Sequence, residues 1–128
     1  MKNESINAIL TKEFATKFAK EWIEGWNSHN LDKILTHYSD DFSIETPMAL
    51  SLFPESKGIF VGKENVKKYW KVGLDKIPNL KFEILDLLLG INVITIYYIN
   101  TATNKKSVEI MHFNSDKKVD RVIVNYSE

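Results

Sequence analysis

The stretch WNSHNLDKILTHYSDDFSIETP, residues 26–47, decides how the first half of the chain is organised. It predicts the end of one amphipathic helix, a polar turn, a short second helix from Leu31 to about Tyr38, and a strand over 42–46. Asn30 is a suitable N-cap for the second helix, because its side-chain oxygen can accept a hydrogen bond from a backbone N–H group of the first turn. Pro47 is expected to end the strand, since proline cannot donate to a β-ladder.

Two further helices flank this stretch. Upstream, apolar residues recur every three or four positions and predict an amphipathic helix: Phe14, Ala15, Phe18, Ala19, Trp22, Ile23 and Trp26. Downstream, residues 48–61 have no regular period and are expected to form a loop that ends in a short extended segment at 59–61. A third helix is expected to begin after Gly62 and to end before Pro78.

From Leu80 onward the hydrophobic period changes to two. Turns are expected at 90–92, 103–106 and 115–117, and they separate strands at 81–84, 93–100, 107–114 and 119–126. Helices followed by hairpin-linked strands predict an α+β fold with a curved antiparallel sheet. No linker or repeat divides the chain, so a single domain is expected over residues 1–128.

Composition argues against several kinds of function. The 17 basic and 17 acidic side chains balance, which argues against a nucleic-acid partner, and the lack of cysteine excludes disulfides and thiolate chemistry. Arg121 is the single arginine, although bidentate phosphate recognition favours arginine. His29, His37 and His112 lack metal-ligand spacing, so no metal or cofactor is expected. Without a secretory signal or a long apolar run, the chain is expected to be cytoplasmic, with no membrane partner.

Several strands are apolar on both faces. In the last strand, Val119 and Ile123 alternate with another apolar set, Val122, Val124 and Tyr126. A one-layer antiparallel sheet normally keeps one face in water. The second face is therefore expected to be covered by another copy of the chain, which predicts a homodimer through the outer sheet face.

Four segments of the chain resemble one known superfamily. They are residues 26–47, 58–64 and 111–114, and the hairpin 114–119 with the following Arg121. Their order and spacing resemble the nuclear transport factor 2-like superfamily, especially its SnoaL-like polyketide cyclase and ketosteroid isomerase branches. The resemblance covers almost the whole chain. It implies that three helices close one side of a strongly bent sheet and leave a cone-shaped cavity.

The resemblance also suggests which chemistry to expect. Ketosteroid isomerase uses an aspartate base and an oxyanion hole made of a tyrosine and a protonated aspartic acid. Matching the motifs places Trp22 where that branch has its tyrosine, Thr46 where it has its base, and Glu109 where it has its protonated acid. Only Glu109 keeps a carboxyl group, so a ketosteroid isomerase of that design is not expected. A limonene epoxide hydrolase, which needs two aspartates and an arginine, is not expected either, because strand alternation turns Arg121 outward.

Glu109 is the leading candidate for chemistry. Alternation puts it on the same strand face as Met111 and Phe113, so its carboxyl should lie among apolar neighbours with a raised pKa. Such a group suits a general acid or base. The alternative is a solvated carboxylate near the open rim. Tyr38 and Tyr126 are the predicted catalytic hydrogen-bond donors to an enolate-like charge.

The other predicted pocket residues are mostly aromatic: Trp22, Trp26, Thr46, Trp70, Tyr98, Met111 and Phe113. Aromatic residues at such spacings also build ordinary cores, and that alternative stays open. With the resemblance, they predict a SnoaL-like protein that binds a small hydrophobic, carbonyl-bearing molecule. If it is catalytic, cofactor-free proton transfer of the isomerase, cyclase or dehydratase type is expected. The alternative is a non-catalytic ligand-binding or dimerisation module of the same fold.

Overall fold

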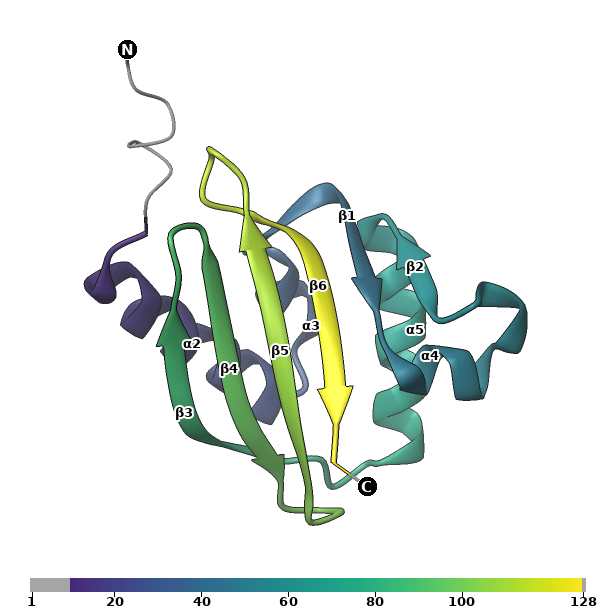
Figure 1. Cartoon of the computed structure of the whole chain (residues 1–128). Coiled ribbons are helices and arrows are strands. Elements are labelled where there is room, and N and C mark those ends of the chain that lie inside the picture. Colours follow the sequence, from purple (N-terminus) through teal and green to yellow (C-terminus); the bar gives the residue numbers. More distant parts are fainter. Residues whose placement is uncertain (1–9, 128) are drawn as a thin grey trace.

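The computed structural model describes residues 10–127 and places helices on one face of a six-stranded sheet (Figure 1). The helices are α2 (Lys12–Asn27), α3 (Leu31–Leu35), α4 (Pro47–Leu52) and α5 (Lys63–Lys76), with a 3-10 turn η1 (Pro54–Ser56) after α4. The strands are β1 (Tyr38–Glu45), β2 (Ile59–Val61), β3 (Phe82–Leu89), β4 (Val93–Asn100), β5 (Lys105–Phe113) and β6 (Val119–Tyr126). Their order across the sheet is β2-β1-β6-β5-β4-β3.

Helix α2 forms as the apolar periodicity predicts. Thr11 caps it by accepting a hydrogen bond from the Phe14 N–H group at 3.0 Å. Its buried stripe, which includes Phe18, Trp22 and Trp26, faces the core. This bulky stripe fills the space between the helix and the inner face of the sheet.

Helix α3 packs closely on α2. Asn30 caps α3 as predicted, because its side-chain oxygen accepts from the Lys33 N–H group at 3.0 Å. A Cβ atom at Gly25 would lie 2.7 Å from Ile34 Cγ1, so only glycine permits this approach of the two helices. Helix α3 ends at Leu35, earlier than predicted, and β1 begins earlier than predicted.

The predicted loop over 48–61 is partly wrong, because it contains α4 and η1. Pro47 occupies the first turn of α4, where its missing N–H group costs nothing. Thr46 is the N-cap, and its Oγ1 accepts from the Met48 N–H group at 3.3 Å. The Thr-Pro pair therefore starts a helix as well as ending a strand.

The sheet is mixed, whereas the sequence predicted a curved antiparallel sheet. Strands β3 to β6 form the expected antiparallel meander. Strand β1, however, runs parallel to β6 and antiparallel to β2. The α+β class is confirmed, with helices closing the inner face of a curved sheet.

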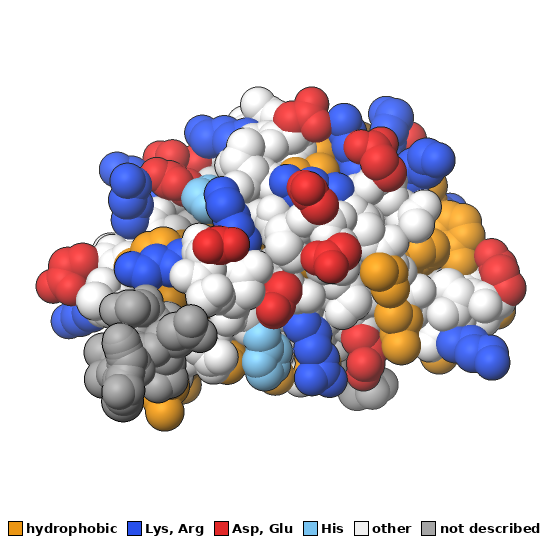
Figure 2. Space-filling model, turned by 90° about the horizontal axis from the view of Figure 1, so that it is seen from above, with side chains coloured by type: hydrophobic (Ala, Val, Ile, Leu, Met, Phe, Trp, Pro, Cys, Tyr) orange, Lys and Arg blue, Asp and Glu red, His pale blue; other side chains and the backbone are white. Residues whose placement is uncertain are grey.

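The distribution of charged side chains on the surface agrees with the balanced net charge of the chain. Figure 2 shows acidic and basic side chains interspersed over the end of the molecule opposite the β4–β5 turn. Arg121 is exposed on β6, as strand alternation predicts. Among residues 10–127, none of the helices combines the length and the apolar composition needed to cross a membrane.

Candidate functional site

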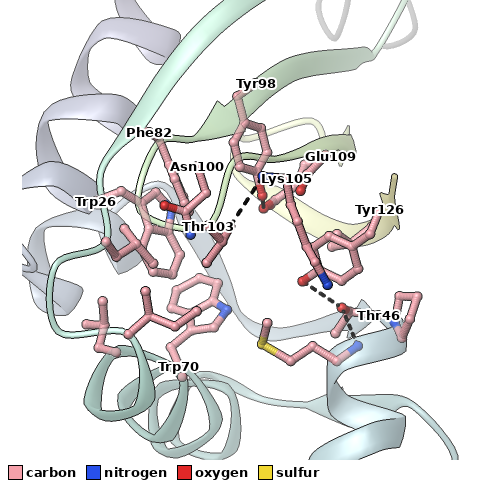
Figure 3. Close-up of a pocket in the computed structure, with 18 of the residues that line it drawn as sticks. Trp26, Thr46, Trp70, Phe82, Tyr98, Asn100, Thr103, Lys105, Glu109 and Tyr126 are labelled. Carbon is pink, nitrogen blue, oxygen red and sulfur yellow. Dashed lines mark hydrogen bonds between the residues drawn. The ribbon is translucent and has the colours of Figure 1, made fainter. Parts of the chain in front are cut away.

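A cavity of about 370 Å³ opens between α5, the start of α4, the end of α2 and the inner face of β4 to β6 (Figure 3). This volume lies in the range of small-molecule sites, roughly 300–1,000 Å³. Its walls are mainly apolar and aromatic, and polar side chains enter from the sheet and from α4. The lining includes Trp26, Thr46, Met48, Tyr69, Trp70, Phe82, Tyr98, Asn100, Thr103, Lys105, Ser107, Glu109, Val124 and Tyr126.

Glu109 is the buried acid of this cavity. Its side chain is only 6% exposed, so the alternative of a solvated carboxylate at the rim does not hold. Tyr98 donates its hydroxyl proton to Glu109 Oε2 at 2.7 Å. Burial raises the pKa of Glu109 from 4.5 to about 7, although the hydrogen bond from Tyr98 opposes that rise. Both protonation states are therefore populated near neutral pH.

A chain of hydroxyl groups lies beside Glu109 at the inner face of the sheet. Thr46 Oγ1 accepts from the Met48 N–H group and donates its proton to Tyr126 Oη at 3.2 Å. The Tyr126 proton is then available to a ligand. Tyr126 pairs with Ser107, one inner-face step along β5 from Glu109. Burial raises the pKa values of Tyr69 and Tyr126, so these phenols stay protonated and remain donors.

Six of the predicted site residues line the cavity: Trp26, Thr46, Trp70, Tyr98, Glu109 and Tyr126. In Figure 3 the Trp26 and Trp70 rings lie on the side of the cavity opposite Tyr126. Their ring centroids are 5.0 Å apart and their planes meet at 70°, an edge-to-face arrangement that forms an angled apolar wall.

Four predicted site residues lie outside the lining, which corrects their placement: Trp22, Tyr38, Met111 and Phe113. The Trp22 N–H group donates to Tyr38 Oη at 3.2 Å, and the Tyr38 hydroxyl meets Met111 Sδ at 3.9 Å. The Phe113 ring packs edge-to-face on Phe18, with centroids 5.1 Å apart. These side chains point into the core as predicted, but they lie where the helices pack directly on the sheet and leave no space for a ligand.

Several lining residues were missed by the sequence reasoning. Ser107 and Lys105 share the inner-face alternation of Glu109, a signal that could have identified them. Asn100 is the last residue of the predicted strand 93–100 and Thr103 lies in the predicted turn that follows, and neither residue was given a functional role. Tyr69 is on the predicted inner stripe of α5, next to Trp70.

The histidines do not gather into a metal site. The part of the chain that the structure describes contains no group of three or more His, Asp or Glu side chains placed to hold a metal ion. His29 contacts the Leu80 carbonyl oxygen at 2.9 Å, and His37 contacts Glu21 at 3.2 Å. Burial lowers the pKa of His37, which the Glu21 charge opposes. His112 faces the outer side of the sheet.

Comparison with known proteins places the chain in a family. The SnoaL-like domain matches residues 19–121, which is most of the chain. The chain belongs to the SnoaL-like family. This SnoaL-like chain is 38% identical to a SnoaL-like protein of unknown function from Burkholderia thailandensis, with a TM-score of 0.88 over 94% of this chain and 99% of the other.

More distant structures share the fold with the SnoaL-like chain. A nuclear transport factor 2-like protein of unknown function from Cytophaga hutchinsonii is 14% identical, with a TM-score of 0.65 over 88% of this chain and 89% of the other. TerC, crystallised with polyporic acid, is 11% identical, with a TM-score of 0.73 over 88% of this chain and 91% of the other. At these identities the likeness concerns the fold alone. A search among curated proteins found no match.

The burial of Glu109 has a consequence for stability that can be measured. Because its pKa rises on folding from 4.5 to about 7, the folded state holds this proton more tightly than the unfolded state. The resulting stabilisation is fully present below pH 4.5 and is lost as the pH rises through about 7. Between about pH 5 and pH 9 we expect this group to lower the free energy of unfolding by roughly 2–3 kcal/mol.

Urea unfolding of the wild type and of Glu109→Gln at both pH values isolates this effect, since other titrating groups are common to both proteins. The free energy of unfolding of the variant, relative to the wild type, should rise with pH by that amount. A difference that stays constant between the two pH values would contradict the buried, protonatable state of Glu109.

Proposed function

We propose that this SnoaL-like chain binds a small, planar, carbonyl-bearing molecule in the cavity and transfers a proton on it without a cofactor. The observation that carries the proposal is Glu109, a buried carboxyl whose pKa is about 7, in a largely apolar cavity. A pKa near the working pH suits a group that must both take and return a proton. Because the Trp26 and Trp70 ring planes meet at 70°, one of these rings can stack on a planar ligand while the other contacts the ligand edge.

In this proposal Glu109, Tyr126 and Tyr98 have separate roles. The Glu109 carboxylate takes a proton from the carbon next to the ligand carbonyl, and the electrons of that C–H bond shift to the carbonyl oxygen as an enolate. Tyr126, itself a hydrogen-bond acceptor from Thr46, donates to this oxygen. Protonated Glu109 then returns the proton to the same or to another carbon, which completes an exchange or an isomerisation. Tyr98 orients the Glu109 carboxyl through its hydrogen bond.

Tyr38 does not contribute in this scheme. Its hydroxyl lies between Trp22 and Met111, away from the cavity lining. Of the two predicted tyrosine donors, Tyr38 and Tyr126, only Tyr126 acts in this scheme.

Proton exchange tests the proposal. The protein is incubated in D₂O with a panel of bicyclic and tricyclic aromatic ketones such as 1-tetralone, and deuterium incorporation next to the carbonyl is followed by NMR. We expect exchange above the buffer rate for ketones that also stabilise the protein thermally. Saturation at a hundred times the dissociation constant should add about 2.7 kcal/mol to the free energy of unfolding. A panel with neither binding nor exchange would refute the proposal.

A second candidate is a ligand-binding module without catalysis. It is favoured by Thr46, a threonine at the position where the isomerase branch carries its base, because a hydroxyl is a poor base at neutral pH. In the described chain Glu109 is the single carboxyl group that lines the cavity. Binding of the ketones without exchange would support this module over the enzyme.

We also propose that the chain forms a homodimer through the outer sheet face, the face turned to the viewer in Figure 1. A row of cross-strand neighbours runs over its middle: Leu88, Thr95, Ile110 and Ile123. Leu88 is 52% exposed, a high value for a leucine in a sheet. A second copy would cover this apolar row.

Ile110→Asp is expected to convert the dimer into a monomer, because it places a charge at the centre of this apolar row. Light scattering at micromolar concentration, coupled to size exclusion, gives the mass directly. The matched control is Thr16→Asp, on the exposed side of α2, which should leave the mass unchanged. A wild-type protein that is monomeric at this concentration would contradict the dimer.

A further inference from the structure

The opening of the cavity at the β4–β5 turn carries hydrogen-bond donors. Asn100 is only 8% exposed, yet it lines the cavity. Its Oδ1 accepts from the backbone N–H groups of Lys81 at 3.4 Å and Ala102 at 3.0 Å. Because the oxygen is held by the backbone, the Nδ2 amide hydrogens are the part of this side chain that remains for a ligand. Thr103 Oγ1 accepts from the Lys105 N–H group at 3.3 Å, so its hydroxyl proton is also available.

Lys105 adds a positive charge to this opening. It is the one cationic side chain among the described residues that line the cavity. It is exposed, and within residues 10–127 its ammonium group takes part in none of the ion pairs. In Figure 3 the Lys105 side chain extends over the cavity from the start of β5. A cation beside the Asn100 and Thr103 donors favours an anionic oxygen.

The spacing of the sheet separates this donor group from Glu109. Along β5, Lys105 lies opposite Asn100, Ser107 lies opposite Tyr98, and Glu109 follows on the same inner face. Four residues of strand span roughly 13 Å at about 3.3 Å per residue. The backbone of the cavity wall therefore carries the acid–base group at Glu109 and the cationic residue Lys105 at two separate positions, and the flexible Lys105 side chain extends from its own position over the cavity.

We infer that the ligand is an amphipathic acid. Its planar hydrophobic body, of two to three rings, places a carbonyl at Glu109, and a carboxylate at its other end meets Lys105 and the Asn100 amide. This assignment rests on the proposed function and narrows it from neutral ketones to carbonyl compounds with a carboxylate. The charge of Lys105 lies at the opening, where it also attracts such anions before they enter.

A matched pair of probes tests this inference. Anthraquinone-2-carboxylate and anthraquinone-2-carboxamide have nearly the same shape and differ in charge, and calorimetry gives the dissociation constant of each. For the wild type at low salt we expect the carboxylate to bind about fivefold more tightly, the upper part of the range for a partly exposed ion pair. The preference should shrink at high salt, because ions screen exposed charges.

Three variants locate the preference. Lys105→Gln should remove it, while Lys106→Gln should leave it intact, because Lys106 pairs with Ile99 on the outer face. Asn100→Asp keeps an oxygen for the Lys81 and Ala102 N–H groups and replaces the donor by a negative charge. It should therefore weaken binding of the carboxylate probe more than binding of the carboxamide probe.

The outcomes separate this inference from the function on which it rests. Equal affinities for the two probes in the wild type would contradict the inference of an anionic ligand, as would a preference for the carboxylate that persists in Lys105→Gln. Neither result would contradict the proposed binding of ketones. Failure of both probes and of the neutral ketone panel to bind would overturn both proposals together.

Discussion

Trp22→Ala is expected to lower the free energy of unfolding by about 3–5 kcal/mol, the cost of removing a fully buried tryptophan from a core. Trp22 is 0% exposed. Its ring packs against both Phe82 and Tyr98, with centroid distances of 5.8 and 5.3 Å, and its N–H group donates a hydrogen bond to Tyr38 Oη. No neighbouring chain segment can move into the space, because the helix and the sheet hold these rings from both sides. The truncation should therefore leave a cavity.

Differential scanning calorimetry measures this effect as a fall in the melting temperature of roughly 10–20 °C for a domain of this size. Trp22→Phe is the matched variant, since it keeps an aromatic ring and removes the hydrogen bond to Tyr38. It should cost about 1–3 kcal/mol, a smaller loss than for alanine. If Trp22→Ala cost less than Trp22→Phe, the Trp22 ring would not be packed among its aromatic neighbours as described.

The sequence was informative wherever structure depends on local spacing. The three- and four-residue period identified α2, and the Asn30 cap located the start of α3. Period-two alternation put Glu109 on the inner face of β5, where the structure places it. Each of these features is encoded within a few residues of the position concerned.

Non-local features were beyond the reach of that reasoning. The parallel pairing of β1 with β6 joins segments about eighty residues apart, and no short pattern specifies it. The depth at which a residue lies along the cavity is also set by distant parts of the chain. Glu109 and Met111 share one strand face, yet Glu109 lines the cavity while Met111 is fully buried and contacts the Tyr38 hydroxyl. Alternation assigns a face, but the curvature of the sheet and the position of the helices decide how much space remains above each residue.

The start of α4 was missed for a different reason. A proline after a strand satisfies two rules at once, since it ends a β-ladder and is favoured in the first turn of a helix. The preceding Thr46 should have decided between them, because threonine is a good N-cap. Recognising that cap would also have explained why Thr46 faces Tyr126: its hydroxyl is held by the Met48 N–H group.

Glu109→Gln is expected to slow proton exchange on a bound ketone by a factor of about 10²–10⁴, the usual contribution of a general base. Glutamine keeps the shape of the side chain and an oxygen that can accept the Tyr98 proton, so ketone affinity should change little. The matched control is Glu83→Gln, at an exposed position on β3. This variant should catalyse proton exchange on the ketone at the wild-type rate. A Glu109→Gln protein that retains full exchange would exclude Glu109 as the base.

The pH profile distinguishes a base from a merely structural carboxyl. Since the carboxylate is the active form, the wild-type rate should rise with pH, reach half its maximum near the Glu109 pKa of about 7, and then level off. Tyr98→Phe sharpens this test. The hydrogen bond from Tyr98 lowers the pKa of Glu109, so its loss should move the midpoint of the profile to higher pH. A midpoint that stays in place, or a profile without one, would mean that the exchanging proton passes through another group.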